Sequence, residues 1–377
     1  MKTLFSPTYN YIFNPKNGTF IRWGATKDEN PEYSPIGPEI LDIEVSTICH
    51  GPNGPCKHCY KSNTPKGANM SLATFMDIFN KIPKTLTQIA FGIGDLDANK
   101  DLVEMFKYCK VNDYNPGVVP NITIHGGDLT DEWVKILATY CGGVAVSVYD
   151  NKNIAYDAVF KLTSAGIEQV NLHVLVSEQT LDRCSMVLDD ILTDKRLEKV
   201  KAVLFLTVKP KGVRNTLNAI KDTKSYKQLI DKAIANNITF GFDSCSAPFV
   251  IDALQNDHRF NTYATFVESC ESNLFSAYIN VEGIYWHCSF TEEHPYWHGI
   301  NLADITDFKK EVWNHDEVRK FRNILLKQDG YILKDCRLCP VYSLYPDSIG
   351  DCSYKPDGVN HALNLKGIPR VKIKKLC

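Results

Sequence analysis

The sequence predicts an α/β fold in which a series of strand–helix units precedes a small, cysteine-rich α+β domain. Strand-like and helix-like segments alternate six or seven times between residues 39 and 250. The alternation then stops, and residues 251–355 are rich in cysteine and aromatic residues. The chain has 377 residues, 44% of them hydrophobic, which is enough to bury a large core. Repeated βα units favour parallel strands, in a barrel or an open sheet covered by helices.

The first expected element is a β-hairpin over residues 9–24. Aromatic and branched residues flank the turn sequence Pro15-Lys16-Asn17-Gly18, in which Asn17 and Gly18 tolerate positive φ. A connection rich in proline and glycine follows at residues 31–38. We therefore assign residues 1–38 to an N-terminal hairpin extension.

The next expected elements are seven strands with helices between them. The strand candidates are residues 39–46, 88–93, 121–125, 143–148, 169–176, 202–208 and 238–242. Thr130 is the expected N-cap of a helix over residues 131–140, and Ser225 with Gln228 forms a capping box for a later helix. In such folds the chemistry lies in loops at the C-terminal ends of the strands.

The last expected elements are short strands at residues 277–281 and 284–286. They belong to a C-terminal α+β domain over residues 251–355, which a basic tail at residues 356–377 follows. We place the domain boundary at Pro248 or shortly after it.

Charge and hydropathy exclude several functions. A formal net charge of −2 provides no strong basic field for nonspecific nucleic-acid binding. No apolar run reaches the ~18 residues of a membrane span, and the first residues lack a signal-peptide core. We therefore expect a cytoplasmic protein without a membrane or nucleic-acid partner.

Thirteen cysteines are unusual for such a protein. In a reducing compartment, clustered cysteines indicate metal binding or redox chemistry rather than disulfides. Cys109, Cys141 and Cys184 stand alone in helical contexts, where each is expected to be a small buried residue.

The first cluster follows the first strand of the βα series. Cys49, Cys56 and Cys59 have the spacing C-x6-C-x2-C in a loop rich in glycine and proline. Three thiolates on a [4Fe–4S] cube leave one iron open for a cofactor or substrate. The alternative is a structural zinc site with His50 or His58 as the fourth ligand.

This cluster resembles that of the radical S-adenosylmethionine (SAM) superfamily, whose usual signature is C-x3-C-x2-C. The present chain has three more residues in the first gap, and His58 replaces the usual aromatic residue, with Tyr60 following. The resemblance covers residues 39–250 and implies a partial (β/α)6 TIM-like barrel. It also implies that the rings of His58 and Tyr60 lie beside the adenine of SAM.

Other positions resemble the SAM site of that superfamily. Gly92-Ile93-Gly94-Asp95 resembles the Gly-Gly-Glu motif that binds the SAM amino group. Ser147 resembles the polar residue that meets the SAM carboxylate or ribose. Asn171 and His173, in the next strand, could face the same site, although a polar residue in a strand is commonly only a hydrogen-bonded wall residue.

A second cysteine set lies beyond the βα series. Cys270 is followed by twelve residues, Gly283, four residues and Cys288, and Cys336-x2-Cys339 comes after a gap of 47 residues. This pattern resembles the opening of the SPASM domain and its shortened twitch form. The resemblance implies one auxiliary [4Fe–4S] cluster held by Cys270, Cys288, Cys336 and Cys339, with Cys352 in reserve. A zinc ribbon uses the same ligand types.

Cys245 directly follows the last strand candidate, at the expected mouth of the barrel. It is a candidate hydrogen-atom donor or substrate contact, and the alternative is a buried thiol with no chemical role.

The resemblance implies an oxidoreductase or maturase-type enzyme with two [4Fe–4S] clusters and SAM. Reductive cleavage of SAM would give a 5′-deoxyadenosyl radical that abstracts hydrogen from a small molecule or peptide. The auxiliary cluster would conduct electrons during oxidation or crosslinking, and a flavodoxin or ferredoxin would be the reductase. The contrasting hypothesis is a noncatalytic binding module braced by zinc.

Overall fold

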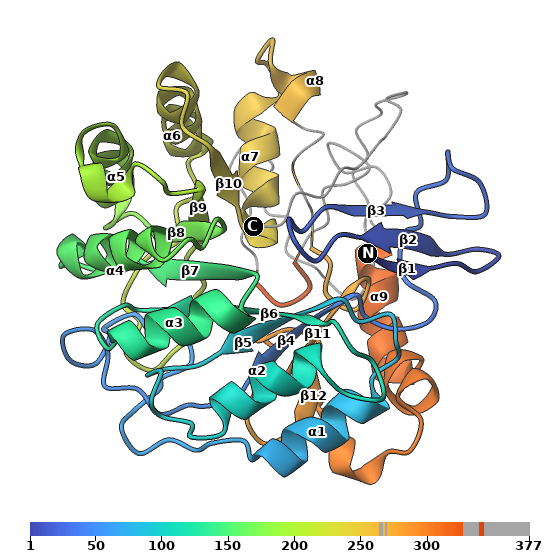
Figure 1. Cartoon of the computed structure of the whole chain (residues 1–377). Coiled ribbons are helices and arrows are strands. Elements are labelled where there is room, and N and C mark those ends of the chain that lie inside the picture. The colour runs from blue at the N-terminus through green and yellow to red at the C-terminus, as the bar shows by residue number, and fades with distance from the viewer. Residues whose placement is uncertain (264–266, 268–269, 327–338, 343–377) are drawn as a thin grey trace.

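Seven consecutive parallel strands form the centre of the fold (Figure 1). The computed structural model describes residues 1–263, 267, 270–326 and 339–342. The strands are β4 (Ile40–Glu44), β5 (Gln88–Gly92), β6 (Val119–Ile124), β7 (Gly143–Ser147), β8 (Val170–Val176), β9 (Ala202–Thr207) and β10 (Phe240–Phe242). Each pairs in parallel with the next. The seven predicted strands and the predicted α/β class are confirmed.

Helices connect these strands and lie along the outside of the curved sheet (Figure 1). They are α1 (Leu72–Lys81), α2 (Leu102–Lys110), α3 (Asp131–Tyr140), α4 (Lys152–Ser164), α5 (Leu181–Thr193) and α6 (Thr223–Ala235), with the short helix η1 (Lys195–Leu197) after α5. Thr130 caps α3, as predicted, because its side chain accepts the N–H of Trp133. The predicted capping box at Ser225 is wrong. Asp222 caps α6 from three residues earlier, so Ser225 lies inside the first turn.

Alternation along each strand divides the apolar core from the barrel interior. Leu41 and Ile43 on β4 are buried in the core between sheet and helices. Asp42 and Glu44, on the opposite face, line the interior. The strands therefore place polar side chains in the barrel interior, and their apolar side chains pack against the helices.

The N-terminal hairpin forms a separate antiparallel sheet. Its strands are β1 (Lys2–Leu4), β2 (Asn10–Phe13) and β3 (Phe20–Trp23), in that order. Gly18 has a φ of 73° in the predicted turn between β2 and β3. Strand β1 was not predicted, because three residues are too few for a periodic pattern.

The C-terminal strands extend the same sheet beyond β4. Strand β11 (Ser276–Ile279) pairs in parallel with β4, and β12 (Ile284–Trp286) and β13 (Ile300–Asn301) follow in antiparallel. Gly283, with a φ of 79°, makes the predicted chain reversal between β11 and β12. The remaining helical elements are η2 (Ser244–Ser246), α7 (Ala247–Leu254), α8 (Phe260–Tyr263), η3 (Leu302–Asp304), η4 (Lys309–Trp313) and α9 (Asp316–Leu326).

None of the helices in the described residues combines the length and the apolar character that crossing a membrane requires.

Candidate functional site

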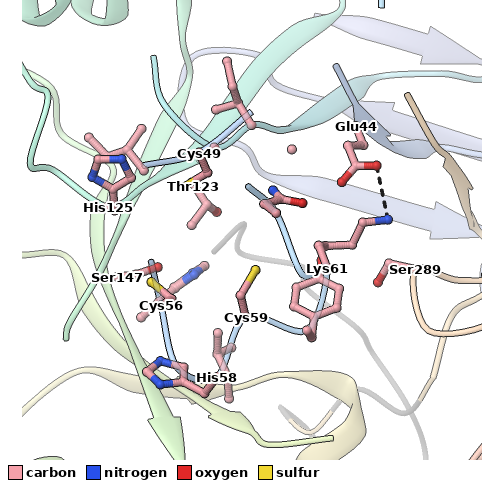
Figure 2. Close-up of a pocket in the computed structure, with 18 of the residues that line it drawn as sticks. Glu44, Cys49, Cys56, His58, Cys59, Lys61, Thr123, His125, Ser147 and Ser289 are labelled. Atoms are coloured by element: carbon pink, nitrogen blue, oxygen red, sulfur yellow. Dashed lines mark ion pairs between the residues drawn. The ribbon is translucent and has the colours of Figure 1, made fainter. Parts of the chain in front are cut away.

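A cavity of about 440 Å³ occupies the barrel interior at the C-terminal ends of the strands. Inward side chains of β4 to β9 form its wall, and the loop that carries Cys49, Cys56 and Cys59 closes one side (Figure 2). Ala90, Gly92 and Thr123 are small, so the wall at β5 and β6 leaves room for a ligand. The volume lies within the range of about 300–1,000 Å³ that small-molecule sites occupy.

The three cysteines of the loop face this one cavity. Cys56 contributes to the electrostatic environment of the Cys49 thiol, and Cys59 contributes to that of the Cys56 thiol. The three sulfur atoms do not all lie within 4.8 Å of one another. Around one tetrahedral zinc, with Zn–S bonds of about 2.3 Å, they would be about 3.8 Å apart. The three sulfur atoms are therefore not at the spacing of a single zinc site.

Backbone contacts fix the shape of this loop. The N–H of Cys49 donates to the carbonyl of Thr64 at 3.0 Å. Arg214 donates to the carbonyls of Cys56 and Asn63, at 3.3 and 2.7 Å. Gly51, with a φ of +75°, makes a turn that a residue with a Cβ would adopt only with strain. The loop is therefore held by contacts among its own residues and by Arg214 from the segment after β9.

Asp95 attaches the loop to the end of β5. Its carboxylate accepts the backbone N–H of His50 at 2.9 Å and lies 2.6 Å from Nδ1 of the same residue. Its other oxygen lies 3.0 Å from Nε2 of His125. Burial alone would raise the pKa of Asp95, but hydrogen bonds from His50 and His125 outweigh it and lower that pKa. Both oxygens therefore bond to the protein itself, and Asp95 is not among the residues that line the cavity.

Cys49, Asp95 and His125 also place one potential ligand atom each within 4.8 Å of one another. This spacing could hold a single metal ion. The hydrogen bond between Asp95 and His125 already explains why these two side chains lie close together. No bound ion is needed to explain this group of three side chains.

Gly92 and Gly94 line the cavity, as the resemblance implied. Gly94 allows the end of β5 to pass directly under the cysteine loop. A Cβ placed on Gly94 would overlap the carbonyl oxygen of Ile48 and lie 2.5 Å from Cβ of Cys49. Glycine is therefore required here by the close approach of two backbones.

Two aromatic pairs flank the cysteines. The ring of His58 stacks on that of Tyr149, with centroids 5.8 Å apart, and the Tyr149 hydroxyl also bonds to the Cys56 sulfur. The ring of Tyr60 lies in the cavity 4.9 Å from that of Phe290. His58 and Tyr60 thus present planar surfaces on one side of the cavity.

The other predicted SAM-site residues separate into two groups. Ser147 and His173, neighbours in the register of β7 and β8, both line the cavity. Burial lowers the pKa of His173 to about 4, so its imidazole is neutral at pH 7. Asn171 is 3% exposed and is not a cavity-lining residue.

A buried ionic network forms the wall next to β11. Lys61, two residues after Cys59, pairs with Glu44 at 3.1 Å and also contacts Glu292. Its Nζ donates to the Tyr278 hydroxyl at 2.7 Å. Burial raises the pKa of Glu44, an effect that Lys61 opposes. The network connects the cysteine loop to the C-terminal segment.

Asp42 lies two residues before Glu44 on the same face of β4, deeper in the barrel. Its side chain also lines the cavity. No ion-pair partner for it is present among the described residues. Enclosure by the barrel wall raises its pKa to about 6.

The second cysteine set is only partly described. Cys339 and Cys270 both contribute to the electrostatic environment of the Cys288 thiol, so these three residues lie in one region of the structure. Cys336 and the reserve residue Cys352 lie outside the described residues. Cys245 is not a lining residue of the cavity, and its thiol has Lys209, Asp243, Cys339 and Cys270 in its electrostatic environment. Its position is therefore in the region of the second set rather than in the cavity wall.

Several cavity residues were not predicted from the sequence. They are Asp42, Lys61, Thr123, His125, Tyr149 and Arg214. The inward register of β4 and β6 could have identified Asp42 and Thr123, whereas Lys61 and Arg214 lie in loops without periodicity.

Comparison with known proteins connects this geometry to a fold. No family model matches the sequence, and no curated protein matches it. SuiB of Streptococcus suis bound to S-adenosylmethionine has a TM-score of 0.63 and 14% identity, covering 83% of this chain and 77% of that chain. Tagged anSMEcpe with bound AdoMet has a TM-score of 0.57 and 16% identity, covering 83% and 89%. The chain shares the fold of these two S-adenosylmethionine-bound proteins.

The shared fold confirms the partial TIM-like barrel that the sequence resemblance implied. A further SuiB structure, bound to the precursor peptide SuiA, has a TM-score of 0.63 and 14% identity, covering 83% of this chain and 76% of that chain. The auxiliary-cluster domain and the individual SAM-site residues stay predictions.

Proposed function

We propose that this chain is a radical SAM enzyme that acts on a peptide or a small molecule. The observation that carries the proposal is the convergence of Cys49, Cys56 and Cys59 on one cavity at the C-terminal ends of parallel strands. Their sulfur atoms do not all lie within 4.8 Å of one another, as the ligands of one zinc ion would. The similarity of the fold to that of SuiB bound to S-adenosylmethionine supports the same proposal.

In this proposal Cys49, Cys56 and Cys59 hold the first cluster, and SAM lies against Gly92, Gly94, Ser147 and His173. When bound, the reduced cluster and SAM supply a 5′-deoxyadenosyl radical that abstracts a hydrogen atom from the substrate. The rings of His58 and Tyr60 provide stacking surfaces for adenine. Asp95 positions the cysteine loop through His50 and His125.

Burial keeps His173 neutral at pH 7, so its imidazole can donate one hydrogen bond and accept another. Residues 39–250 would form the SAM-binding barrel and residues 251–355 the auxiliary domain.

A peptide is supported as a substrate class by similar structures. SuiB was solved with the precursor peptide SuiA, and native anSMEcpe with AdoMet and the Cp18Cys peptide. The proposed reaction is an oxidation or a crosslinking in which an auxiliary cluster conducts electrons. The proposed reductase is a flavodoxin or a ferredoxin.

Metal content and SAM cleavage test the proposal together. Anaerobic reconstitution should give brown protein with about eight irons per chain if two cubes form. Reduction with dithionite in the presence of SAM should produce 5′-deoxyadenosine. Replacing Cys49, Cys56 and Cys59 together with alanine should remove about four irons and abolish 5′-deoxyadenosine formation.

The matched control is Cys141→Ala, because Cys141 is half-buried and lies outside both cysteine sets. It should retain full iron content and SAM cleavage. Colourless wild-type protein with stoichiometric zinc would instead support the noncatalytic binding module.

A further inference from the structure

One acidic side chain in the cavity has no partner among the described residues. Asp42 faces inward from β4, and its neighbours in the sheet register are Ala90 on β5 and Tyr278 on β11. Its side chain is exposed to the cavity. Within the part of the chain that the structure describes, no hydrogen bond or ion pair reaches its carboxylate. Because acids enclosed by protein are normally paired, Asp42 is available to a ligand.

The lysine on the same wall cannot serve as the counterion of Asp42. Lys61 has three N–H donors on its ammonium group. Its Nζ lies 3.1 Å from Glu44 and 2.7 Å from the Tyr278 hydroxyl. It also contacts the carboxylate of Glu292. All three donors of Lys61 therefore have partners other than Asp42.

The second cation that lines the cavity is also bonded elsewhere. Arg214 donates to the backbone carbonyls of Cys56 and Asn63 and so holds the cysteine loop. The unpaired negative charge of Asp42 consequently has no lysine or arginine partner among the described lining residues. A cavity with an unpaired charge attracts ligands of the opposite sign.

Asp42 lies deeper in the barrel than the residues that we propose to hold SAM. On β5, Gly92 follows Ala90, the register neighbour of Asp42, by two residues. Two residues of a strand span about 7 Å, and Gly94 follows still nearer to the cysteine loop. Asp42 therefore belongs to a part of the cavity below the proposed SAM site.

Apolar side chains form another part of the cavity wall. Leu175 on β8 and Leu206 on β9 are neighbours in the sheet register, and both line the cavity. Apolar walls with a few polar groups that fix orientation are typical of small-molecule sites. Such a wall suits the methylene groups of an alkyl chain. The carboxylate of Asp42, which accepts hydrogen bonds, suits an ammonium group at the end of that chain.

We propose that Asp42 binds an alkylammonium group of the substrate, either the side chain of a peptide lysine or a small aliphatic amine. The inference rests on the proposed function and narrows its substrate class. The ammonium donates hydrogen bonds to Asp42, and the alkyl chain extends from there toward the cysteine loop. Asp42 thereby determines which carbon atoms of the substrate face the proposed SAM site.

Binding of matched probes tests this inference. Reconstituted full-length protein, with and without SAM, is titrated at pH 7.5 and followed by ligand-observed NMR. The probes are n-pentylamine against 1-pentanol, and Nα-acetyl-lysine N-methylamide against its norleucine counterpart, which separates a free amine from a peptide lysine. At this pH both Asp42, with a pKa of about 6, and an alkylamine, with a pKa of about 10, are charged.

At least one of the two cations should bind wild type about tenfold or more tightly than its neutral counterpart. Asp42→Asn should remove this preference and leave binding of the neutral probe unchanged. Asp113→Asn, the same chemical change at an exposed position, is the control and should keep the preference.

Two results would overturn the inference at once. They are equal binding of cationic and neutral probes to wild type, and an unchanged preference for the cation in Asp42→Asn. An equal loss of SAM affinity in Asp42→Asn would also overturn it, because the acid would then hold SAM, which is itself a cation. Protein that binds neither iron nor SAM, yet binds the cation through Asp42, would overturn the proposed function and leave the cation site.

Discussion

The Asp95 carboxylate accepts the backbone N–H of His50 at 2.9 Å, and its oxygen lies 2.6 Å from Nδ1 of the same residue. Because an ionised carboxylate only accepts, Nδ1 must carry the proton. His50 directly follows Cys49, and Asp95 ends the segment after β5. The two residues therefore connect the second barrel strand to the first cysteine of the loop.

Asp95→Asn should loosen this loop. The substitution replaces a charged acceptor with a neutral amide, and hydrogen bonds to charged groups contribute about 1.5–3 kcal/mol. We expect faster loss of iron to a chelator and weaker SAM binding, both by about tenfold or more. Asp77→Asn, at the exposed pair with Lys81 on α1, is the control and should change neither. Equal chelation rates in wild type and Asp95→Asn would contradict this role.

Gly94→Ala should displace the cysteine loop. The new methyl group would overlap the carbonyl of Ile48 and press on Cys49. Overpacking of this kind costs about 1–3 kcal/mol, so we expect lower iron content after reconstitution and a lower melting temperature. Gly143→Ala on β7 is the control, because its Cβ would meet no atom closer than 3.4 Å. Normal iron content in Gly94→Ala would show that the loop can move without cost.

Asp42→Asn should change the pH dependence of stability. The folded-state pKa of Asp42 is raised to about 6, whereas an unfolded aspartate has a pKa of about 3.9. Between about pH 4 and pH 6 the folded state binds more protons at Asp42 than the unfolded state does. The contribution of Asp42 to the free energy of unfolding therefore falls as the pH rises. Asp42→Asn should therefore be the more stable protein at pH 7.5 and match wild type near pH 4. Urea unfolding of both proteins across this range measures the difference, and parallel curves would contradict it.

Lys61→Met should destabilise the fold strongly. Lys61 is 10% exposed and neutralises Glu44, which is 6% exposed, and Glu292. Removing one partner of a buried ionic group costs about 3–5 kcal/mol, because Glu44 loses its counterion and Glu292 keeps only Lys211, at 4.0 Å, among the described residues. Lys107→Met, at an exposed pair with Glu104, should cost no more than about 1 kcal/mol. Similar urea midpoints for the two variants would disprove the importance of the network.

The strands of the barrel could be predicted because their apolar residues are continuous. Segments such as residues 202–208 are apolar on both faces, a pattern typical of a buried parallel strand. The pairing of β11 with β4 could not be predicted, because the sequence of a four-residue strand does not indicate which distant strand it pairs with. Asp42 and Glu44 were overlooked as interior groups, since acids in a strand normally indicate the solvent face.

The candidate site also contains residues that could be predicted from the sequence and residues that could not. The spacing of Cys49, Cys56 and Cys59 is local, so one loop was enough to predict that they act together. The presence of Cys270 and Cys339 in the electrostatic environment of Cys245 depends on the paths of β10 and of the C-terminal segment, which no short spacing encodes. The contact of Lys61 with Glu292 joins residues 231 positions apart for the same reason.

The parallel pairing of β4 with β11 has a consequence for synthesis of the chain. Ser276 is opposite Ile40, so one edge of β4 has no neighbour until more than two hundred further residues have been translated. At ribosomal rates of about 5–20 residues per second, that wait is roughly 10–50 s. During this time the nascent protein exposes an unpaired strand edge, a known starting point for aggregation. Slower initiation at low temperature, or abundant chaperones, should therefore raise the soluble yield.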